Sequence, residues 1–374
     1  MLDIKIKHTL KEELTVLMYD ENYAIIYERE LEHNDNFQVD LEEIKFVRFE
    51  TETLLSEFVI LNGMIQNILV SFNKKTKALD VSFYTNSNDY GFVKTVKFKD
   101  KLNLVHAKRN KKRVHILFPP NFNPDDKYNL LIMIDGQNMF DKKKVGKYTR
   151  LNDPYNGWQI ETSLKMAYDK YNLGKFIVVG VETTGIPRMK ELTLPSSFGE
   201  LKKMELRGIE ESVKVGALDK TADFIMDTVV PYIKSHYLIT DYVGIGGSSA
   251  GGATAQYIGV KYNKFFKFIL SLSPAMAIWS DETINKFYLE SELKDNKNLP
   301  YYFYNMGNRE GLEEYLNKLN ENTLSMLKEH GYDDNKLITY YEPNGQHNEI
   351  MWRYAVAYAF EQIILKEKEN NGKN

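Results

Sequence analysis

Apolar and polar residues alternate over the first hundred positions of the chain. Alternation with a period of two is typical of strands that bury one face, and here it recurs in short runs at close spacing. We therefore expect residues 1–104 to form a small antiparallel β-sandwich domain. The runs that carry this prediction are Ile4/Ile6, Leu14/Val16/Met18, Tyr23/Ile25/Tyr27, Phe37/Val39/Leu41, Val81/Phe83 and Val93/Val96/Phe98.

The pattern changes after Val105, where apolar runs alternate with stretches of helical periodicity. The runs Leu130–Ile134 and Phe176–Val181 are apolar throughout, which is typical of strands buried on both faces. Strands alternating with helices indicate a mostly parallel, doubly wound sheet with helices on both faces. We therefore expect residues 105–374 to form an α/β domain whose functional residues lie at the carboxyl ends of its strands.

The stretch from Asp241 to Gly252 predicts a buried strand, a glycine-walled turn and the start of a helix. Residues 247–251 read Gly-Ser-Ser-Ala-Gly and fit G-x-S-x-G, the pattern of a nucleophile held at a sharp strand-to-helix turn. Such a turn leaves no room for side chains beside the nucleophile, which explains the glycine on each side. The pattern predicts that Ser249 is the nucleophile and that Ser248 points elsewhere.

Three other interpretations of this stretch compete with the first. A dinucleotide-binding G-x-G-x-x-G loop has its first two glycines in Gly244 and Gly246, but Ser249 occupies the third position. No acidic residue follows between Tyr242 and Ser280 to hold a ribose. A phosphate-binding Walker loop needs a lysine, which is absent here. A flexible glycine/serine linker would not have core-like residues on both sides.

A serine nucleophile needs a base within hydrogen-bond reach and an acid that orients the base. In a doubly wound hydrolase the chain order is serine, acid, histidine, and only His330 and His347 follow Ser249. His330 precedes Gly331 at an expected helix C-terminus. His347 follows the expected strand Leu337–Tyr341 and a turn, so we expect His347 to be the base.

The acid is expected on the loop after the strand Tyr301–Asn305. Glu310 is the first carboxylate past that strand, whereas Glu313 and Glu314 fall in the following helix, where carboxylates are usually solvated. We therefore expect Glu310 to orient His347 and to stabilise its cation during turnover.

Two backbone N–H groups are expected to stabilise the oxyanion that forms during the reaction. One belongs to Ala250, the residue after the nucleophile. The other is expected from the loop Asp135–Asn138, which ends an early apolar strand. In that loop Gly136 gives access to the backbone, and Gln137 is the expected donor.

The amino-acid composition excludes some types of catalytic and metal site and makes some partners less favourable. The 374 residues include no cysteine, which excludes thiolate catalysis and thiolate metal sites. With 49 basic and 52 acidic residues the net charge is −3, which favours neither nucleic acid nor anionic membranes as partners. The N-terminus lacks the apolar core of a secretion signal, and the apolar-leaning stretch Leu54–Phe72 is interrupted by polar residues. We expect a cytoplasmic protein without cofactor or metal, and leave its oligomeric state open.

Together, these segments resemble the putative-esterase family of α/β-hydrolases, which includes esterase D, enterochelin and other siderophore trilactone esterases, and feruloyl esterases. The resemblance covers roughly Val105 to Leu365, and the joint order of its motifs is more specific than any one of them. Glu182 departs from it, since many relatives carry asparagine there. The motifs are Asp135-Gly136-Gln137-Asn138-Met139-Phe140-Asp141, Arg188 with Glu191-Leu192-Thr193, Gly246–Gly252, Ser273-Pro274-Ala275, Gly307–Glu310, and Gly345-Gln346-His347 with Trp352.

The resemblance implies an α/β-hydrolase fold and a serine carboxylic-ester hydrolase with Ser249, Glu310 and His347 as nucleophile, acid and base. It also implies that Gln137 and Ala250 supply the oxyanion hole. The expected substrate is a small-molecule ester such as a siderophore trilactone or an acylated carbohydrate.

Asn138, Trp158 and Arg188 are expected to line the substrate site. For Trp158 the alternative is core packing, and for Arg188 it is an ion pair with Glu191. Two other functions stay open, namely acyl transfer to an alcohol at the same site and glycan binding by a non-catalytic protein on a hydrolase fold.

Overall fold

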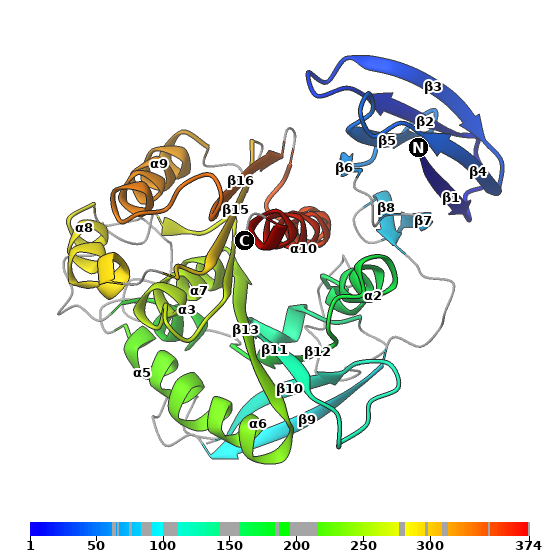
Figure 1. The fold of residues 1–374 in the computed structure, drawn as a ribbon. Coiled ribbons are helices and arrows are strands. Elements are labelled where there is room, and N and C mark those ends of the chain that lie inside the picture. Colours follow the sequence, from blue (N-terminus) through cyan, green and yellow to red (C-terminus); the bar gives the residue numbers. More distant parts are fainter. Residues whose placement is uncertain are drawn as a thin grey trace.

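The computed structural model comprises an N-terminal pair of small sheets and a large α/β unit (Figure 1). None of the helices in the described ranges is long and apolar enough to cross a membrane. The structure describes residues 1–61, 65, 67–74, 77–83, 91–99, 111–141, 157–183, 187–194, 216–276, 281–295, 298–308, 313–342 and 345–372.

The N-terminal strands form two four-stranded sheets, in the orders β4-β1-β7-β8 and β3-β2-β5-β6. Inward and outward residues alternate as predicted, for example along β1, where Leu2, Ile4 and Ile6 are buried. The pairings among these strands are antiparallel, except that β1 runs parallel to β7. The strands are β1 (Leu2–His8), β2 (Leu14–Tyr19), β3 (Ile25–Leu31), β4 (Asn34–Val39), β5 (Phe46–Glu50), β6 (Val59–Ile60), β7 (Asn67–Asn73) and β8 (Ala78–Phe83).

The large unit is built on an eight-stranded sheet in the order β16-β15-β14-β13-β11-β12-β10-β9. Its strands from β11 to β16 are parallel, and β10 and β9 are antiparallel additions at one edge. The prediction of a mostly parallel, doubly wound sheet is confirmed. The strands are β9 (Phe92–Lys99), β10 (Lys111–Phe118), β11 (Tyr128–Ile134), β12 (Phe176–Val181), β13 (Ile239–Ser248), β14 (Phe268–Leu272), β15 (Tyr301–Gly307) and β16 (Leu337–Glu342).

Strand β9 corrects one expectation. Its alternating residues were expected in the N-terminal sandwich, but it pairs along its whole length with β10, from Phe92 opposite Phe118 to Lys99 opposite Lys111. Alternation predicts a half-buried strand without saying which sheet it joins, so the sequence offered no means of making this choice. The division of the chain into two domains at residue 104 stays a prediction.

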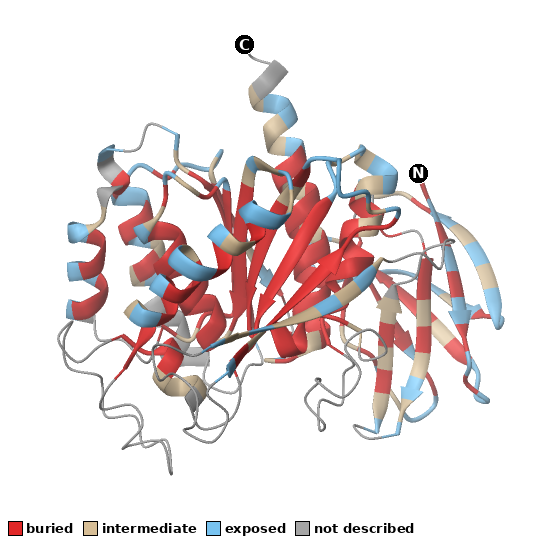
Figure 2. Cartoon of the chain, turned by 90° about the horizontal axis from the view of Figure 1, so that it is seen from below, coloured by how far each residue is buried: buried red, intermediate tan, exposed pale blue. Residues whose placement is uncertain are grey.

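Helices cover both faces of the large sheet, and alternate residues of each strand separate the two cores (Figure 2). In β11, Leu131 and Met133 pack toward α2 and α10, whereas Leu130, Ile132 and Ile134 pack toward the remaining helices. The helices are α2 (Ile160–Tyr171), α3 (Pro187–Leu192), α5 (Leu218–Asp223), α6 (Val230–His236), α7 (Ala250–Lys261), α8 (Asp281–Glu290), α9 (Glu313–Glu329) and α10 (Glu349–Gly372), with the 3-10 turns η1 (Gly136–Asn138) and η6 (Glu292–Asp295) and the π-helical segment η4 (Phe224–Val229).

Pro231 lies inside a helical stretch, where a proline usually kinks or ends the helix. The chain instead stays helical from α5 through η4 and α6 to His236. Because η4 is π-helical, the hydrogen-bond register shifts just before Pro231, and the proline falls in the first turn of α6, where its missing N–H is tolerated.

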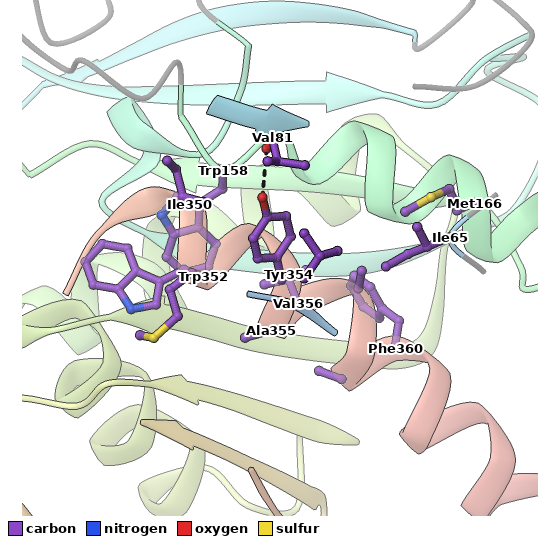
Figure 3. Packing of buried hydrophobic residues seen from close by; sticks show 14 of the residues in the cluster. Ile65, Val81, Trp158, Met166, Ile350, Trp352, Tyr354, Ala355, Val356 and Phe360 are labelled. Atoms are coloured by element: carbon purple, nitrogen blue, oxygen red, sulfur yellow. Dashed lines mark hydrogen bonds between the residues drawn. The ribbon is translucent and has the colours of Figure 1, made fainter. Parts of the chain in front are cut away.

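One cluster of buried apolar side chains joins the N-terminal sheets to the large unit. It includes Ile4, Val16 and Val81 of the small sheets as well as Tyr354 and Phe360 of α10. Figure 3 shows this packing, with α10 lying between the strand that carries Val81 and the large sheet. The small sheets and the α/β unit therefore share a core.

Candidate active site

Ser249 lies between β13 and α7, at the carboxyl end of a central strand. Its backbone angles, φ 57° and ψ −128°, are strained for a residue with a side chain. Neighbouring backbone fixes this conformation: the N–H of Ser249 donates to the carbonyl of Leu272 at 2.9 Å, and the N–H of Ala275 donates to the carbonyl of Ser249 at 3.0 Å. The predicted strand, turn and helix are present, and the turn presents a partly exposed serine.

The glycines beside Ser249 are required by close backbone approach. A Cβ on Gly247 would lie 2.3 Å from the carbonyl oxygen of Gly251, and a Cβ on Gly252 would lie 2.7 Å from that of Leu272. A Cβ on Gly251 would lie 2.8 Å from a carboxylate oxygen of Asp135, so the turn and the loop after β11 touch at this point.

The loop after β11 carries Gln137, the expected second oxyanion donor, in the short turn η1. The side-chain amide of Gln137 is engaged elsewhere, since it donates to Asp135 at 3.1 Å and to the carbonyl of Thr183 at 2.7 Å. Gln137 lies in the first turn of η1 and Ala250 at the start of α7, positions where backbone N–H groups lack acceptors within their own helix. Both N–H groups therefore remain suited to binding an anion.

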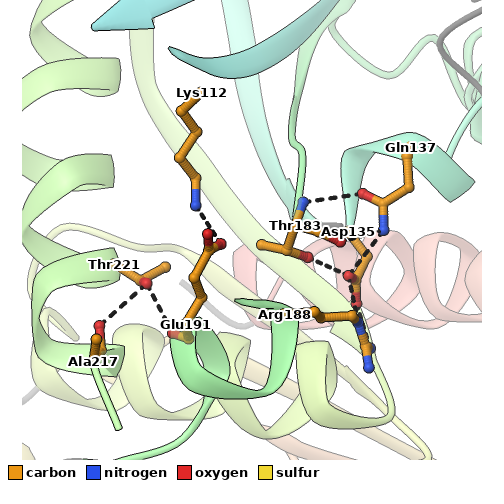
Figure 4. A network of polar contacts seen from close by, with 8 residues as sticks. All are labelled: Lys112, Asp135, Gln137, Thr183, Arg188, Glu191, Ala217 and Thr221. Atoms are coloured by element: carbon orange, nitrogen blue, oxygen red, sulfur yellow. Dashed lines mark hydrogen bonds and ion pairs between the residues drawn. The ribbon is translucent and has the colours of Figure 1, made fainter. Parts of the chain in front are cut away.

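Asp135 anchors this loop through a buried polar network (Figure 4). Arg188 donates to its two carboxylate oxygens at 2.8 and 2.7 Å, and the hydroxyl of Thr183 donates to it as well. Burial disfavours the charged carboxylate, but the ion pair with Arg188 and the hydrogen bonds outweigh it and lower the pKa of Asp135. Asp135 is thus a fixed anion between the loop and the nucleophile turn.

The predicted ion pair between Arg188 and Glu191 is wrong. Glu191, three residues along α3, pairs with the buried amine of Lys112 at 2.5 Å rather than with Arg188 (Figure 4). The two side chains meet different partners, because Lys112 lies on β10 and Asp135 lies in the loop after β11. Arg188 itself lies beside the loop of the expected oxyanion hole.

His347 lies between β16 and α10, on the loop where the chain order places the base. Its imidazole packs edge-on against the indole of Trp352, with ring centroids 5.0 Å apart. The indole N–H of Trp352 donates at 2.9 Å to the hydroxyl of Ser273, in the same loop whose Ala275 bonds the carbonyl of Ser249. A chain of contacts therefore links the surroundings of His347 to those of Ser249.

Glu310 lies outside the described residues, as does the start of its loop after Asn308. The described part of that loop touches the loop of His347: a Cβ on Gly307 would lie 2.3 Å from the carbonyl oxygen of Gly345. Asn308 also donates its N–H to the carbonyl of Glu342 at 3.1 Å. The role of Glu310 stays a prediction, as do those of Ser249, His347, Gln137 and Ala250.

His330, the other candidate base, ends α9 as its sequence context predicted. It is buried, and its Nδ1 bonds the carbonyl of Met326 at 2.7 Å. Its ring packs against Tyr288, on the helical side of the core rather than on a loop beside the elbow.

Trp158 and Asn138 are buried side by side. Trp158 is 1% exposed, its ring centroid lies 5.8 Å from that of Trp352 in a tilted arrangement, and its backbone N–H donates to the carbonyl of Asn138 at 2.9 Å. Core packing therefore accounts for Trp158 in this structure, and substrate contact by Trp158, Asn138 or Arg188 stays a prediction.

Thr183 was not singled out in the sequence, and Asp135 and Glu182 were named there without a role in the site. Thr183 and Asp135 build the network behind the elbow, although Asp135 carried a signal as an acidic residue between an apolar strand and a glycine. Glu182 accepts a hydrogen bond from Arg113 and lies 3.3 Å from His115. Among the residues that the structure describes, no group of three or more histidine, aspartate or glutamate side chains is arranged to hold a metal ion.

Comparison with known proteins places this geometry in context. A family model described as "Putative esterase" matches residues 106–362. No curated protein matches the chain.

Three solved structures illustrate the shared fold. The siderophore hydrolase EstA from Aspergillus nidulans is 13% identical, with a TM-score of 0.55 over 76% of this chain and 98% of that one. An IroE-like serine hydrolase from Shewanella oneidensis is 16% identical, with a TM-score of 0.52 over 72% and 80%. A CE1 ferulic acid esterase from Anaeromyces mucronatus is 12% identical, with a TM-score of 0.51 over 75% and 92%. At these identities the likeness shows the fold alone, and it confirms the α/β-hydrolase fold.

Proposed function

Because the chain belongs to the putative esterase family and is a carboxylic ester hydrolase, we propose that it works through an acyl-enzyme on Ser249, with His347 as base and Glu310 as the acid that orients it. The observation that carries this proposal is the backbone of Ser249, held at φ 57° and ψ −128° between a strand and a helix. Strain of this kind persists where surrounding structure enforces it, and it is characteristic of nucleophile turns.

In the proposed reaction the Ser249 hydroxyl attacks the ester carbonyl carbon while His347 takes its proton. The N–H groups of Gln137 and Ala250 stabilise the oxyanion of the tetrahedral intermediate. The intermediate collapses, and His347 returns the proton to the departing alcohol. Water, deprotonated by His347, then attacks the acyl-enzyme, so that the carboxylic acid leaves and Ser249 is regenerated.

The substrate we propose is an ester of a siderophore trilactone or of an acylated carbohydrate. Support comes from the names of proteins that share the fold, a siderophore hydrolase and a ferulic acid esterase. Rates on acetyl, butyryl, feruloyl and enterobactin-like esters test this choice. Rates that rank both the feruloyl and the trilactone esters below simple acetyl esters would count against it.

The test of the mechanism uses adjacent serines. Ser249→Ala is expected to abolish hydrolysis of p-nitrophenyl acetate and labelling by a fluorophosphonate probe. Ser248→Ala, a change one residue away at a buried position, is expected to retain both. The assignment fails if Ser249→Ala hydrolyses the ester at the wild-type rate. Glycerol added as an acceptor separates hydrolysis from acyl transfer, because transfer gives glyceryl acetate as product.

The base and the acid have matched controls of their own. His347→Gln is expected to lower kcat by several orders of magnitude, whereas His330→Gln removes a histidine that lies away from the elbow. Glu310→Gln is compared with Glu313→Gln and Glu314→Gln, and the assignment of the acid requires the largest loss in Glu310→Gln.

A further inference from the structure

The helix α10 begins directly after the His347 loop, and three consecutive residues near its start are buried. They bond the loop of Ser273, the strand β8 and the segment at Gly157. Trp352 is 5% exposed, and Arg353 and Tyr354 are 1% exposed. The helix begins just before them, where the side chain of Asn348 accepts the N–H groups of Ile350 at 3.0 Å and Met351 at 3.1 Å. Such a cap fixes where the helix starts, and therefore where the preceding loop leaves it.

Trp352 is the surface on which the His347 imidazole packs. Trp352 is itself held by its hydrogen bond to Ser273 and by its contact with Trp158. A movement of the first turns of α10 would therefore move Trp352 and, with it, the ring of His347.

Arg353 and Tyr354 tie these turns to the N-terminal sheets. Arg353 donates from Nη1 to the carbonyl of Val81 at 2.8 Å. Tyr354 donates its hydroxyl to the same oxygen at 3.0 Å, and Figure 3 shows this second bond. Val81 belongs to β8, the edge strand of its sheet. A carbonyl on a covered sheet edge needs donors from outside the sheet, and α10 supplies two of them.

Arg353 also reaches the segment that follows the expected oxyanion loop. Its Nη2 donates to the carbonyl of Gly157 at 2.9 Å. Gly157 lies against that loop, because a Cβ on it would stand 2.9 Å from the carbonyl oxygen of Asn138. One buried guanidinium thus joins β8, α10 and the chain beside the loop of Gln137, and its charge is further compensated by Asp80 at 3.5 Å.

We propose that the N-terminal sandwich is a positioning element of the catalytic apparatus. Through the carbonyl of Val81 it holds Arg353 and Tyr354, and through them the start of α10 and the imidazole of His347. This inference rests on the proposed function, because His347 must be the base for its position to affect turnover. A displacement of a catalytic group by about 1 Å can lower the rate roughly 100-fold, so small shifts at this helix should be measurable.

The test compares two tyrosine hydroxyls that tie α10 to neighbouring strands: Tyr354, on the helix, bonds Val81 of β8, and Tyr242, on β13, bonds Glu367 of α10. Tyr354→Phe removes the bond to Val81 at the end of α10 that follows the His347 loop. Tyr242→Phe removes a 2.8 Å bond to Glu367, which lies roughly 20 Å beyond Tyr354 along α10 at 1.5 Å per residue. With p-nitrophenyl acetate, Tyr354→Phe is expected to lower kcat about 3- to 10-fold with KM unchanged, and Tyr242→Phe to leave both near wild type.

Arg353 supplies a second measurement. Arg353→Met is expected to lower kcat and the rate of Ser249 labelling by a fluorophosphonate about 10- to 100-fold. Arg353→Lys should recover part of the loss, because an ammonium keeps the charge but cannot reach Val81 and Gly157 together. If these contacts had only a structural role, the variants would lower the fraction of folded protein and leave kcat per folded molecule unchanged. Each rate is therefore divided by the folded fraction, measured by circular dichroism.

The outcomes separate this inference from the proposed function. One outcome overturns the inference alone. The wild type shows Ser249-dependent hydrolysis, and both Tyr354→Phe and Arg353→Met keep the wild-type kcat per folded molecule. The mechanism then stands. Equal losses in Tyr354→Phe and Tyr242→Phe also overturn the inference, since they would reflect general loosening of α10. If wild type lacks Ser249-dependent hydrolysis, the mechanism fails and the inference falls with it.

Discussion

The guanidinium of Arg188 and the carboxylate of Asp135 form a two-point ion pair, Nε to Oδ1 at 2.8 Å and Nη2 to Oδ2 at 2.7 Å. Oδ2 of Asp135 is also the atom that a Cβ on Gly251 would meet at 2.8 Å. One carboxylate thus lies against the nucleophile turn while its own loop carries Gln137. We therefore expect the ion pair to hold the loop of Gln137 against the turn that carries Ala250.

Arg188→Met is therefore expected to lower kcat about 10- to 100-fold, less than the roughly 100- to 1000-fold loss on removing an oxyanion donor directly. The measurement is hydrolysis of p-nitrophenyl acetate below the unfolding temperature. The control is Lys112→Met, which breaks the neighbouring buried pair with Glu191. Each variant removes the cation that pairs with a buried carboxylate, at a cost of up to about 3–5 kcal/mol of stability. Equal losses of kcat in the two variants would show that stability, not donor geometry, is responsible.

The positive φ of Ser249 should make glycine more stable than alanine at this position. Glycine adopts positive φ without strain, whereas alanine does not. Ser249→Gly is therefore expected to be more stable than Ser249→Ala by roughly 1–3 kcal/mol, the usual range for such strain. Urea unfolding of both inactive variants measures the difference. No difference between them would mean that the turn relaxes once the hydroxyl is lost.

Adding a side chain at Gly247 should lower the stability of the fold. The added Cβ would meet backbone, the carbonyl oxygen of Gly251 at 2.3 Å, which has no room to move. Gly247→Ala is therefore expected to cost about 3 kcal/mol or more, at the upper end of overpacking effects. The control is Gly174→Ala, whose Cβ would meet only the end of the Asn129 side chain at 2.8 Å. A cost in Gly247→Ala no larger than in this control would contradict the close packing of the elbow.

Glu342 predicts a pH dependence of stability. Burial is the main cause that raises the pKa of this carboxyl to about 8, the hydrogen bond from Tyr340 lowers it, and Glu57 raises it further. In the unfolded chain the group ionises near pH 4.5, so between about pH 4.5 and 8 the unfolded state releases a proton that the folded state keeps. Stability is full below this window and falls as pH rises through it.

Glu342→Gln removes this titration while keeping an acceptor for Tyr340. Its advantage over wild type in unfolding free energy is expected to grow with pH across the window, by up to about 1.4 kcal/mol per pH unit. Denaturant unfolding at several pH values measures it, with exposed Glu290→Gln as the control. A constant difference between Glu342→Gln and wild type from pH 5 to pH 8 would show that Glu342 is already ionised.

The strands and the elbow could be predicted because both depend on local pattern. Alternation defined β1 and β2, and the glycines around Ser249 reflect contacts within a few residues. What the pattern lacked was the order of strands in the sheet. Arg188 meets Asp135, 53 residues away, only because β12 lies beside β11. Spacing along α3 suggested Glu191 instead, which three-dimensional placement overruled.

Arg353 shows the same limit more strongly. Its partner Val81 is 272 residues away, in a part of the chain that predictions treated as separate. The only sequence signal was a charged residue inside the apolar run of α10, and a buried charge needs partners whose identity depends on tertiary structure.

The pairing of β9 with β10 bears on where the chain can be cut. A truncation at residue 104 would remove an edge strand that carries Lys94, Lys97 and Lys99, charges that discourage edge-to-edge association. The newly exposed border would be β10, whose residues from Val114 to Phe118 are buried and apolar apart from His115. Expression of residues 105–374 alone should therefore yield aggregates, and a fragment that keeps this edge of the sheet covered would have to begin before Phe92.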